Sequence, residues 1–467
     1  MTMALSITRR GLLAGASVFM AARAMPVRAA PSPFILTAAP GKASLLGAEA
    51  GPADVWAYNG AICGPEIRAK KGEEVVVRFQ NRLDQPSTVH WHGIRIDNRM
   101  DGVANLTQPP VEPGAEFDYR FTVPDAGTYW YHPHSRTWEQ VARGLSGPLI
   151  IEEDEPVDVD GDHVLHLTDW RVRDDGNIDI ASLGAPMDWS HAGRMGNILT
   201  TNGQPEWSLS AAPGTRHRLR FINACNARIL GVSVKGHRLT AIAVDGQPLA
   251  SPLDLGTAPF TLAPAQRVDV VLDLTGKPGD RSDVIVTSGN AEVVAGTVTV
   301  ADAPSRPVRD TLLPLPANAV ATPGKTTRDI LLAMDGGAMS WLSEATYKGQ
   351  LLDGRTLAQD HNMFWAFNGV AGMPDEPLFT AKRGETIRLD MRNNTAWPHA
   401  IHFHGHHGVE VARMRGRLQP GFRDTVLVDV DETVSVAFVA DNPGKWMIHC
   451  HMLEHQAAGM ATWFAVA

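Results

Sequence analysis

The chain has 467 residues, of which 44% are hydrophobic and 20% are charged, and its formal net charge is −9 at pH 7. This length is sufficient for three domains of about 120–150 residues, each with a core of its own. The acidic balance argues against a nucleic acid or an anionic membrane surface as a partner.

The first thirty residues predict a targeting segment rather than part of the fold. Thr8–Leu13 (TRRGLL) is followed by an apolar run to Ala22 and by small residues at Val27–Ala30. This arrangement resembles a twin-arginine signal peptide, and its apolar run is too short to span a bilayer. We therefore expect residues 1–30 to direct export by the twin-arginine machinery to the periplasm, with no stable membrane insertion of the mature protein.

Alternating runs of apolar and polar residues predict short β-strands. Examples are Val75–Phe79, Glu116–Phe121 and Arg218–Phe221, which lie between clusters of Gly, Pro, Asn and Asp. Period-two alternation bounded by turn residues is typical of antiparallel strands. Helical periodicity is scarce, so we expect an all-β protein built of three Greek-key β-sandwiches.

An internal repeat supports this division. Ala69–Glu73 precedes His90 by the same distance as Ala381–Glu385 precedes His402. Three copies share one spacing of glycine and asparagine, at Gly72 and Asn81, Gly214 and Asn223, and Gly384 and Asn393. The middle copy carries none of the paired histidines that mark the other two.

Changes in composition predict the boundaries between the copies. Glu152–Asp162 is acidic and rich in turn residues, and Ala301–Thr327 is rich in proline. The predicted segments are a first domain at 31–153, a second at 160–300, a linker at 301–327 and a third domain at 328–467.

Four non-overlapping histidine pairs have one residue between their two members. Residues i and i+2 of a strand point to one face, so each pair can offer two imidazoles to a metal. A single pair is commonly an ordinary surface feature, but four pairs are poorly explained by chance or by core packing. The pairs are His90 and His92, His132 and His134, His402 and His404, and His449 and His451.

The last pair flanks a cysteine. Cys450, His455 and Met460, with His399, provide the ligand types of a blue-copper electron-transfer site, which takes two His, one Cys and a weak axial Met. If the residues around Cys450 form a strand, its two neighbouring histidines point away from that copper and can bind a second centre.

The motifs HxHG, HxH, HxxHxH and HCHxxxHxxxxM occur in this order and resemble the ligand signature of the three-domain multicopper oxidases, the laccase and metal-oxidase family. The resemblance covers essentially the whole mature chain and implies tandem cupredoxin-like domains with about four copper ions: one type 1, one type 2 and two type 3. It implies type 1 ligands His399, Cys450, His455 and Met460, type 2 ligands His90 and His402, and type 3 ligands His92, His132, His134, His404, His449 and His451.

The two end copies differ in what they can bind. Opposite the four type 1 ligands, the first copy has Ser87, Pro133, Trp138 and Arg143, so it cannot hold a type 1 copper. Both copies keep the histidine pairs. We therefore expect a three-copper cluster at the contact between the first and third domains.

The resemblance implies a one-electron oxidation of a small-molecule or metal-ion donor coupled to four-electron reduction of O2 to water. Oxygen reduction consumes protons, and Asp101 matches the family's carboxylate near the type 2 copper; its alternative is a turn aspartate before glycine. Glu454 is a second candidate relay or a solvated residue. Gln456 replaces a glutamate that many bacterial relatives carry, so the proton route stays open.

The electron donor is less well defined by the sequence. Met334, Met339 and Met363 are scattered rather than clustered, and Thr395 and Trp397 stand where cuprous oxidases carry an acid and a methionine. This favours a laccase-like oxidase of phenols or aromatic amines over a periplasmic oxidase of Cu(I), manganese or iron. A non-enzymatic cupredoxin scaffold or copper-binding protein is a lesser alternative.

The last two predictions concern a disulfide and the oligomeric state. The chain has three cysteines, and with Cys450 assigned to copper, an exported compartment permits a disulfide between Cys63 and Cys225. We expect a monomer.

Overall fold

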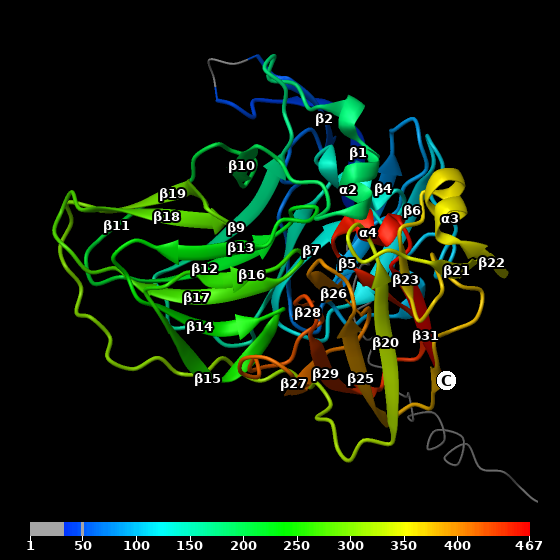
Figure 1. The fold of residues 1–467 in the computed structure, drawn as a ribbon. Coiled ribbons are helices and arrows are strands. Elements are labelled where there is room, and N and C mark those ends of the chain that lie inside the picture. Colours follow the sequence, from blue (N-terminus) through cyan, green and yellow to red (C-terminus); the bar gives the residue numbers. More distant parts are fainter. Residues whose placement is uncertain (1–31, 48–50) are drawn as a thin grey trace, which may run out of the picture. The chain divides into compact units, whose positions relative to one another are not determined.

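The computed structural model describes residues 32–47 and 51–467. The predicted targeting segment at 1–30 lies outside these residues. Strands dominate the described part of the chain (Figure 1), and none of its helices is long and apolar enough to cross a membrane. The helices are α1 (Thr137–Ala142), α2 (Pro186–Ser190), α3 (Gly354–His361), α4 (Leu453–Ala457) and the 3-10 turns η1 (Asn98–Met100) and η2 (Ile180–Ser182).

The first sandwich has two four-stranded sheets, in the orders β2-β1-β4-β6 and β3-β8-β7-β5. Its core contains Val77, Phe79 and Tyr131. Its strands are β1 (Phe34–Ala43), β2 (Ala53–Tyr58), β3 (Ile67–Lys70), β4 (Glu74–Asn81), β5 (His90–His92), β6 (Glu116–Thr122), β7 (Gly127–His132) and β8 (Gly147–Glu152).

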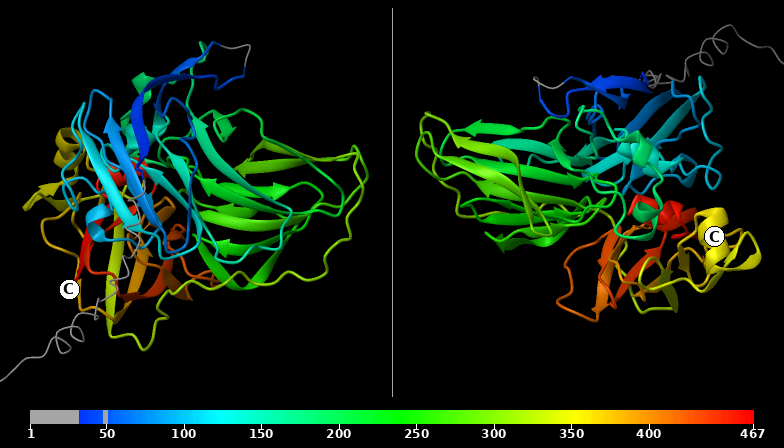
Figure 2. Two further views of the ribbon diagram at one scale, coloured as in Figure 1. Left: turned by 180° about the vertical axis from the view of Figure 1, so that it is seen from behind. Right: turned by 45° about the horizontal axis from the view of Figure 1, so that its top comes forward.

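The middle sandwich has sheets in the orders β10-β9-β12-β17-β14-β15 and β11-β19-β18-β13-β16. Figure 2 shows its strands, drawn in green, from two further directions. They are β9 (Gly161–Trp170), β10 (Ile198–Thr201), β11 (Ser208–Ala211), β12 (Arg216–Asn223), β13 (Leu230–Val234), β14 (Leu239–Val244), β15 (Gln247–Gly256), β16 (Phe260–Leu262), β17 (Arg267–Asp273), β18 (Arg281–Ser288) and β19 (Ala291–Val300).

The third sandwich has sheets in the orders β23-β20-β25-β29-β27 and β24-β31-β30-β26-β28, with a separate hairpin β21-β22. Its strands are β20 (Arg328–Gly336), β21 (Glu344–Tyr347), β22 (Gln350–Asp353), β23 (Trp365–Phe367), β24 (Thr380–Ala381), β25 (Glu385–Asn393), β26 (His399–Phe403), β27 (Gly408–Arg413), β28 (Thr425–Val428), β29 (Thr433–Ala440), β30 (Gly444–Cys450) and β31 (Ala461–Val466).

The three sandwiches share one connectivity. In each, the first strand pairs in parallel with the strand of the Gly-to-Asn repeat, as β1–β4, β9–β12 and β20–β25. In each second sheet an early strand pairs in parallel with a late one, as β3–β8, β11–β19 and β24–β31. The prediction of three β-sandwiches is confirmed. The prediction of antiparallel strands omitted these parallel pairs, which arise because connections cross between the two sheets of each sandwich.

Strands β4 and β12 both alternate apolar and polar residues, but their polar faces lie in different surroundings. In β4, Phe79 is fully buried while Arg78 stays at the surface and pairs with Asp118. In β12 the arginine face is also buried, since Arg218 and Arg220 are at most 1% exposed. These charges are compensated by buried acids: Arg218 donates to Asp269 and Glu153, and Arg220 donates to Asp162. The polar face of β12 is therefore an internal, ion-paired surface.

The third sandwich supplies a direct test of core packing. Leu389 in β25 is fully buried, and Leu389→Ala is expected to destabilise the protein by about 2–5 kcal/mol because it leaves a cavity. The urea midpoint of the metal-free protein measures this loss. Leu351→Ala in β22, at a side chain 65% exposed, is the matched control and is expected to change stability by at most about 0.5 kcal/mol. Equal midpoints for the two variants would contradict the burial of Leu389 in the core.

Candidate metal centre

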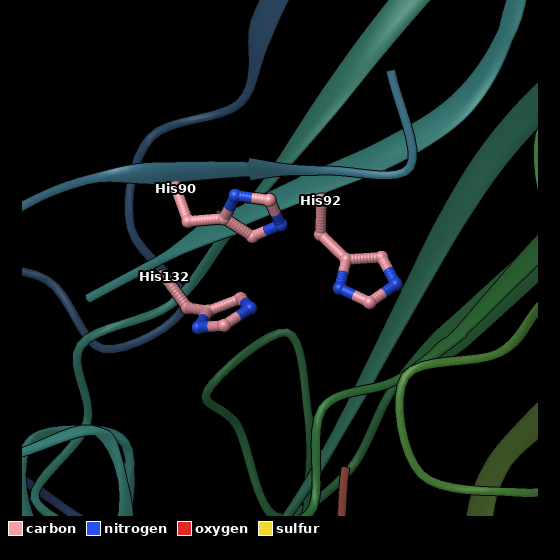
Figure 3. A group of neighbouring side chains, drawn as sticks. All are labelled: His90, His92 and His132. Atoms are coloured by element: carbon pink, nitrogen blue, oxygen red, sulfur yellow. The ribbon is translucent and has the colours of Figure 1, made fainter. Parts of the chain in front are cut away.

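Strands β5 and β7 of the first sandwich carry one set of paired histidines. His90 and His92 occupy alternate positions of β5 and point to the same face. Figure 3 shows their rings beside that of His132, which lies opposite His90 in the β5–β7 ladder. The ring centroids of His90 and His132 are 5.4 Å apart, and the ring of His134 lies 5.3 Å from that of His90. Four imidazoles thus gather at one edge of this sandwich.

Strands β26 and β30 of the third sandwich carry the second set in the same arrangement. His402 lies opposite His449, as His90 lies opposite His132 in the first sandwich. His404 and His451 each follow directly after their strand. The ring of His402 lies 4.8 Å from that of His404 and 5.5 Å from that of His449.

The two sets meet at the contact between the first and third sandwiches. The rings of His90 and His404 stack with centroids 4.0 Å apart, and those of His92 and His402 stack at 3.8 Å. The ring of His451 lies 4.9 Å from that of His92. The structure therefore brings together all eight histidines of the four pairs, and each is at most 5% exposed.

Hydrogen bonds around the cluster fix which nitrogen of each ring faces inward. Because a carbonyl only accepts, a neutral ring whose Nδ1 bonds a carbonyl carries its proton there and an unshared pair on Nε2. His92 is reversed, since its Nε2 lies 3.3 Å from Oδ1 of Asp424 and its Nδ1 has no partner. Nδ1 donates to a carbonyl in His90 (Asp101, 2.7 Å), His132 (Pro133, 2.9 Å), His402 (Asp424, 2.9 Å) and His449 (Cys450, 2.9 Å).

The inward-facing nitrogens fit a metal. Burial lowers the pKa of His404 and His449 well below its usual range, so both rings are neutral at physiological pH. Their Nε2 atoms are only 3.2 Å apart. Unshared pairs facing one another in a buried site repel, and a cation between them removes that repulsion. Buried Nε2 atoms without any hydrogen-bond partner occur in His90, His132, His402 and His451.

A second group lies behind the cluster, on the other face of β30. Cys450, His399 and His455 are fully buried, and the Cys450 Sγ lies 3.6 Å from Nδ1 of His399 and 3.7 Å from Nδ1 of His455. The outer nitrogens are hydrogen bonded: Nε2 of His399 to Oγ1 of Thr395 at 2.8 Å, and Nε2 of His455 to the carbonyl of His191 at 2.6 Å. Two imidazoles and a thiol thus converge on one point.

The remaining members of this group are also buried. Met460 is fully buried in the same core cluster as Cys450, and its carbonyl accepts from the Cys450 N–H at 3.1 Å. Burial raises the pKa of the Cys450 thiol to about 12. Binding of a metal as thiolate must therefore release that proton.

The other two cysteines, Cys63 and Cys225, are both free, so no disulfide joins them in this structure.

Asp101 lies against the cluster. Its carboxylate is 3.0 Å from Nδ1 of His404 and 3.3 Å from Nδ1 of His90, and the residue is 3% exposed. The next residue, Gly102, has φ +81°, and a Cβ there would collide with the carbonyl of Val89. Asp101 is therefore a turn residue before a glycine that the fold requires, and its carboxylate also contacts two histidines of the cluster.

Asp424 also contacts the histidine cluster, although the sequence did not predict it. Its carboxylate lies 3.3 Å from Nε2 of His92 and 3.4 Å from Nδ1 of His402. It precedes β28 outside the histidine motifs, and no local spacing or repeat marks it. Only the pairing of β28 with β26 places it beside the cluster.

Glu454 contacts the middle sandwich. Its carboxylate accepts from Nδ2 of Asn226 at 2.8 Å and from the backbone N–H of Arg194 at 3.1 Å. Burial raises its pKa to about 7. Two residues along, Oε1 of Gln456 is buried and has no hydrogen-bond partner.

His406, His407 and Trp397 lie close to residues of these two groups. Nδ1 of His406 donates to the His404 carbonyl at 3.2 Å, and Nε2 of His407 lies 3.4 Å from Asp424. Trp397 is half-buried, and its ring lies 5.4 Å from that of His191. The carbonyl of His191 accepts a hydrogen bond from Nε2 of His455.

Comparison with known proteins identifies the family. Three family models described as multicopper oxidase match residues 40–156, 161–301 and 345–467. The multicopper oxidase MmcO of Mycobacterium tuberculosis is 32% identical over 436 residues, covering 87% of this chain and 82% of its own length. The chain belongs to the multicopper oxidase family.

Further similarities agree with this. A crystal structure of a multi-copper oxidase from Pseudomonas thermotolerans superimposes with a TM-score of 0.82 at 32% identity, covering 93% of this chain and 99% of that one. Laccase-1 of Fomitopsis schrenkii is 29% identical (86% of this chain, 81% of its own). A copper resistance protein A homolog of Pseudomonas syringae pv. tomato is 26% identical (86% and 87%). This multicopper oxidase is a copper-dependent oxidoreductase with tandem cupredoxin-like β-sandwiches, which takes electrons from a donor and passes them to O2.

The buried neutral histidines predict how the copper-free oxidase responds to acid. Burial lowers the pKa of His166 to about 4, whereas an unfolded histidine titrates near 6.5. The unfolded state therefore binds more protons below about pH 6.5, and the free energy of unfolding is expected to fall as the pH decreases from 6.5 toward 4. Urea midpoints of the copper-free protein from pH 8 to 4.5 measure this profile.

His166→Gln isolates one contribution. Its profile between pH 6 and 5 is expected to be shallower than that of the wild type by about 1.4 kcal/mol per pH unit, the value for one proton. Above pH 7 the two slopes are expected to coincide, which is the internal control. Parallel profiles at all pH values would mean that His166 is not buried neutral.

Proposed function

We propose that this multicopper oxidase is laccase-like and couples one-electron oxidation of phenols or aromatic amines to the reduction of O2 to two waters, with four electrons and four protons consumed. The observation that carries the proposal is the presence of two separate candidate ligand sets: eight imidazoles at the contact between the first and third sandwiches, and a Cys-His-His group on the other face of β30. The laccase relative supports the choice of donor.

We assign the copper ligands as follows. A type 1 copper is held by His399, Cys450, His455 and Met460; a type 2 copper by His90 and His402; and two type 3 coppers by His92, His132, His134, His404, His449 and His451. Copper in these sites would supply one-electron redox chemistry between a donor and O2. The inward-facing nitrogens and the buried thiol support the assignment, and the number of about four ions follows from it.

The chain itself connects the two sites. Cys450 is bonded through the backbone to His449 and His451, and strand alternation directs its side chain away from theirs. A few covalent bonds therefore join the group around Cys450 to the eight-histidine cluster, which is the short connection that electron transfer needs.

Asp101 and Glu454 are proposed to handle protons. Asp101, in hydrogen-bond contact with Nδ1 of His404, orients that ring and can hold a proton at the edge of the cluster. Glu454 exchanges a proton near neutral pH, since burial raises its pKa to about 7. Its hydrogen bonds to Asn226 and Arg194 place that proton beside the middle sandwich.

Oxidation of Cu(I) or another metal ion is the second candidate function. Its support is Met339, which is 88% exposed and follows Ala338. The N–H of Ala338 donates to the carbonyl of Ser190. The next residue, His191, accepts a hydrogen bond from Nε2 of His455 at its carbonyl, so Met339 is two short links from a proposed copper ligand. A thioether suits Cu(I), and the copper resistance protein A homolog is a relative. A non-enzymatic scaffold is disfavoured because each assigned ligand position is filled.

We also propose the domain limits 31–153, 160–300 and 328–467 with a linker at 301–327, supported by the absence of strand pairing between the three sets of described strands. Residues 1–30 are proposed to be a twin-arginine signal peptide that directs export to the periplasm, and the mature protein to be a monomer.

The donor proposal is tested by oxygen uptake of the copper-loaded protein. A phenolic donor is expected to support uptake with a higher kcat/KM than Cu(I), and Met339→Ala is expected to leave the phenol rate unchanged. The matched control is Met373→Ala, at another exposed methionine, whose side chain is 41% exposed. Rapid uptake with Cu(I) alone, lowered by Met339→Ala but not by Met373→Ala, would establish the metal-ion alternative. No uptake with either donor would contradict both.

Cys450→Ser tests the ligand assignment. The variant is expected to lose the intense visible thiolate absorption and about one copper per chain, and to lower the oxygen-uptake rate by at least about a thousandfold, because donor electrons no longer reach the cluster. Cys225→Ser, at another buried free cysteine, is the control and is expected to keep colour and copper content. Persistence of the blue colour in Cys450→Ser would rule the assignment out.

A further inference from the structure

One fully buried arginine of the middle sandwich reaches the histidine cluster. Arg267 begins β17, in a sandwich that supplies none of the assigned copper ligands. Its Nη1 donates to Oδ1 of Asp424 at 2.9 Å, and its Nη2 donates to Oδ2 at 2.5 Å. Both side chains are at most 1% exposed. A two-pronged bond of this kind fixes the plane of the carboxylate as well as its position.

The guanidinium is itself held from several directions. Its Nε donates to the carbonyl of Thr128 in the first sandwich at 3.2 Å, and Nη1 donates to the carbonyl of Ala265 at 3.1 Å. Asp245 lies 3.5 Å from Nη1 and also accepts from the Arg267 backbone N–H at 3.1 Å. Arg267 therefore contacts all three sandwiches and has little freedom to move.

The glycine after the first histidine pair provides an independent observation. Gly93 has φ +87°, and a Cβ built there would collide with the guanidinium of Arg267 and with the carboxylate of Asp424. The residue that follows His92 thus leaves space for this ion pair. Glycine at this position of the first HxHG motif is favoured both by the positive φ and by the arginine that packs against the turn.

Asp424 transmits this constraint to two ligand rings. It accepts from Nε2 of His92, so that Nδ1 of His92 faces the cluster, and it lies 3.4 Å from Nδ1 of His402. Both carboxylate oxygens of Asp424 accept from the Arg267 guanidinium, so they stay where Arg267 places them.

We propose that Arg267 is a positioning residue of the copper cluster: through Asp424 it fixes the orientation of His92 and His402. The ligand-free middle sandwich thereby takes a direct part in building a site between its two neighbours. The inference rests on the proposed assignment of His92 and His402 as ligands. Outer groups that orient metal ligands commonly change metal affinity by about 10–100-fold when removed.

The test is retention of copper in folded holoenzyme. The wild type, Arg267→Gln and Arg267→Lys are equilibrated with increasing concentrations of a chelator, and the electron paramagnetic resonance signal of the type 2 copper is followed beside the visible type 1 absorption. Arg267→Gln is expected to lose the type 2 signal at a chelator concentration about 10–100-fold lower than the wild type, with the type 1 absorption unchanged. Arg267→Lys, which keeps the charge but not the two-pronged geometry, is expected to fall between them.

Arg216→Gln is the matched control. Arg216 is also buried in the middle sandwich and forms a two-pronged pair, with Asp273 at 2.6 and 3.0 Å, but it makes no hydrogen bond or ion pair to a cluster residue. It is expected to retain type 2 copper as the wild type does. Wild-type retention in Arg267→Gln, or an equal loss in Arg216→Gln, would overturn the proposal.

Two outcomes separate this inference from the assignment it rests on. If Arg267→Gln does not fold, Arg267→Lys decides, and retention equal to that of the wild type overturns the positioning role. If the wild type itself holds no type 2 copper, the ligand assignment fails rather than the role of Arg267 alone.

Discussion

Eight imidazoles gathered in one buried space, several with a ring nitrogen that has no hydrogen-bond partner, are the constraint on which the rest of this structure depends. Such an arrangement is unfavourable without a cation, because burial removes the water that would otherwise bind the unshared pairs. The carbonyls of Asp101, Pro133, Asp424 and Cys450 enforce it by accepting the outer N–H of their histidines. Backbone carbonyls therefore hold four of the eight rings in orientations that leave Nε2 free of that contact.

Neither end sandwich can make this space alone, so the contact between them must be held in register. The middle sandwich contributes to that register through buried charge. Arg220 donates to Thr128 of the first sandwich, and Arg267 donates to Asp424 of the third. Buried ion pairs contribute little net stability when compared with apolar packing, but their directional bonds specify one relative arrangement. That property suits a site whose candidate ligands come from two folding units.

Much of the fold and of the site could be predicted from local patterns. The strand pattern at Val75–Phe79 and the repeat around His90 and His402 predicted the sandwiches, because period-two alternation and equal spacing are direct consequences of strand geometry. The strand around Cys450 was predicted to direct the thiol and its flanking histidines to opposite faces, and the structure has that arrangement in β30. Burial of the β12 arginines could not be predicted, because an alternating polar face has the same sequence pattern whether water or acids lie against it.

The sequence by itself determined the types, order and spacing of the candidate ligands, because copper sites of this kind use His, Cys and Met and a strand repeats every two residues. Only the tertiary structure decided which groups surround those ligands. Asp424 and Arg267 lie far from the first histidine pair in the chain and carry no motif, yet they contact His92 and the turn at Gly93. Such contacts depend on how three sandwiches pack, and packing between separate folding units leaves no periodic signal in a sequence.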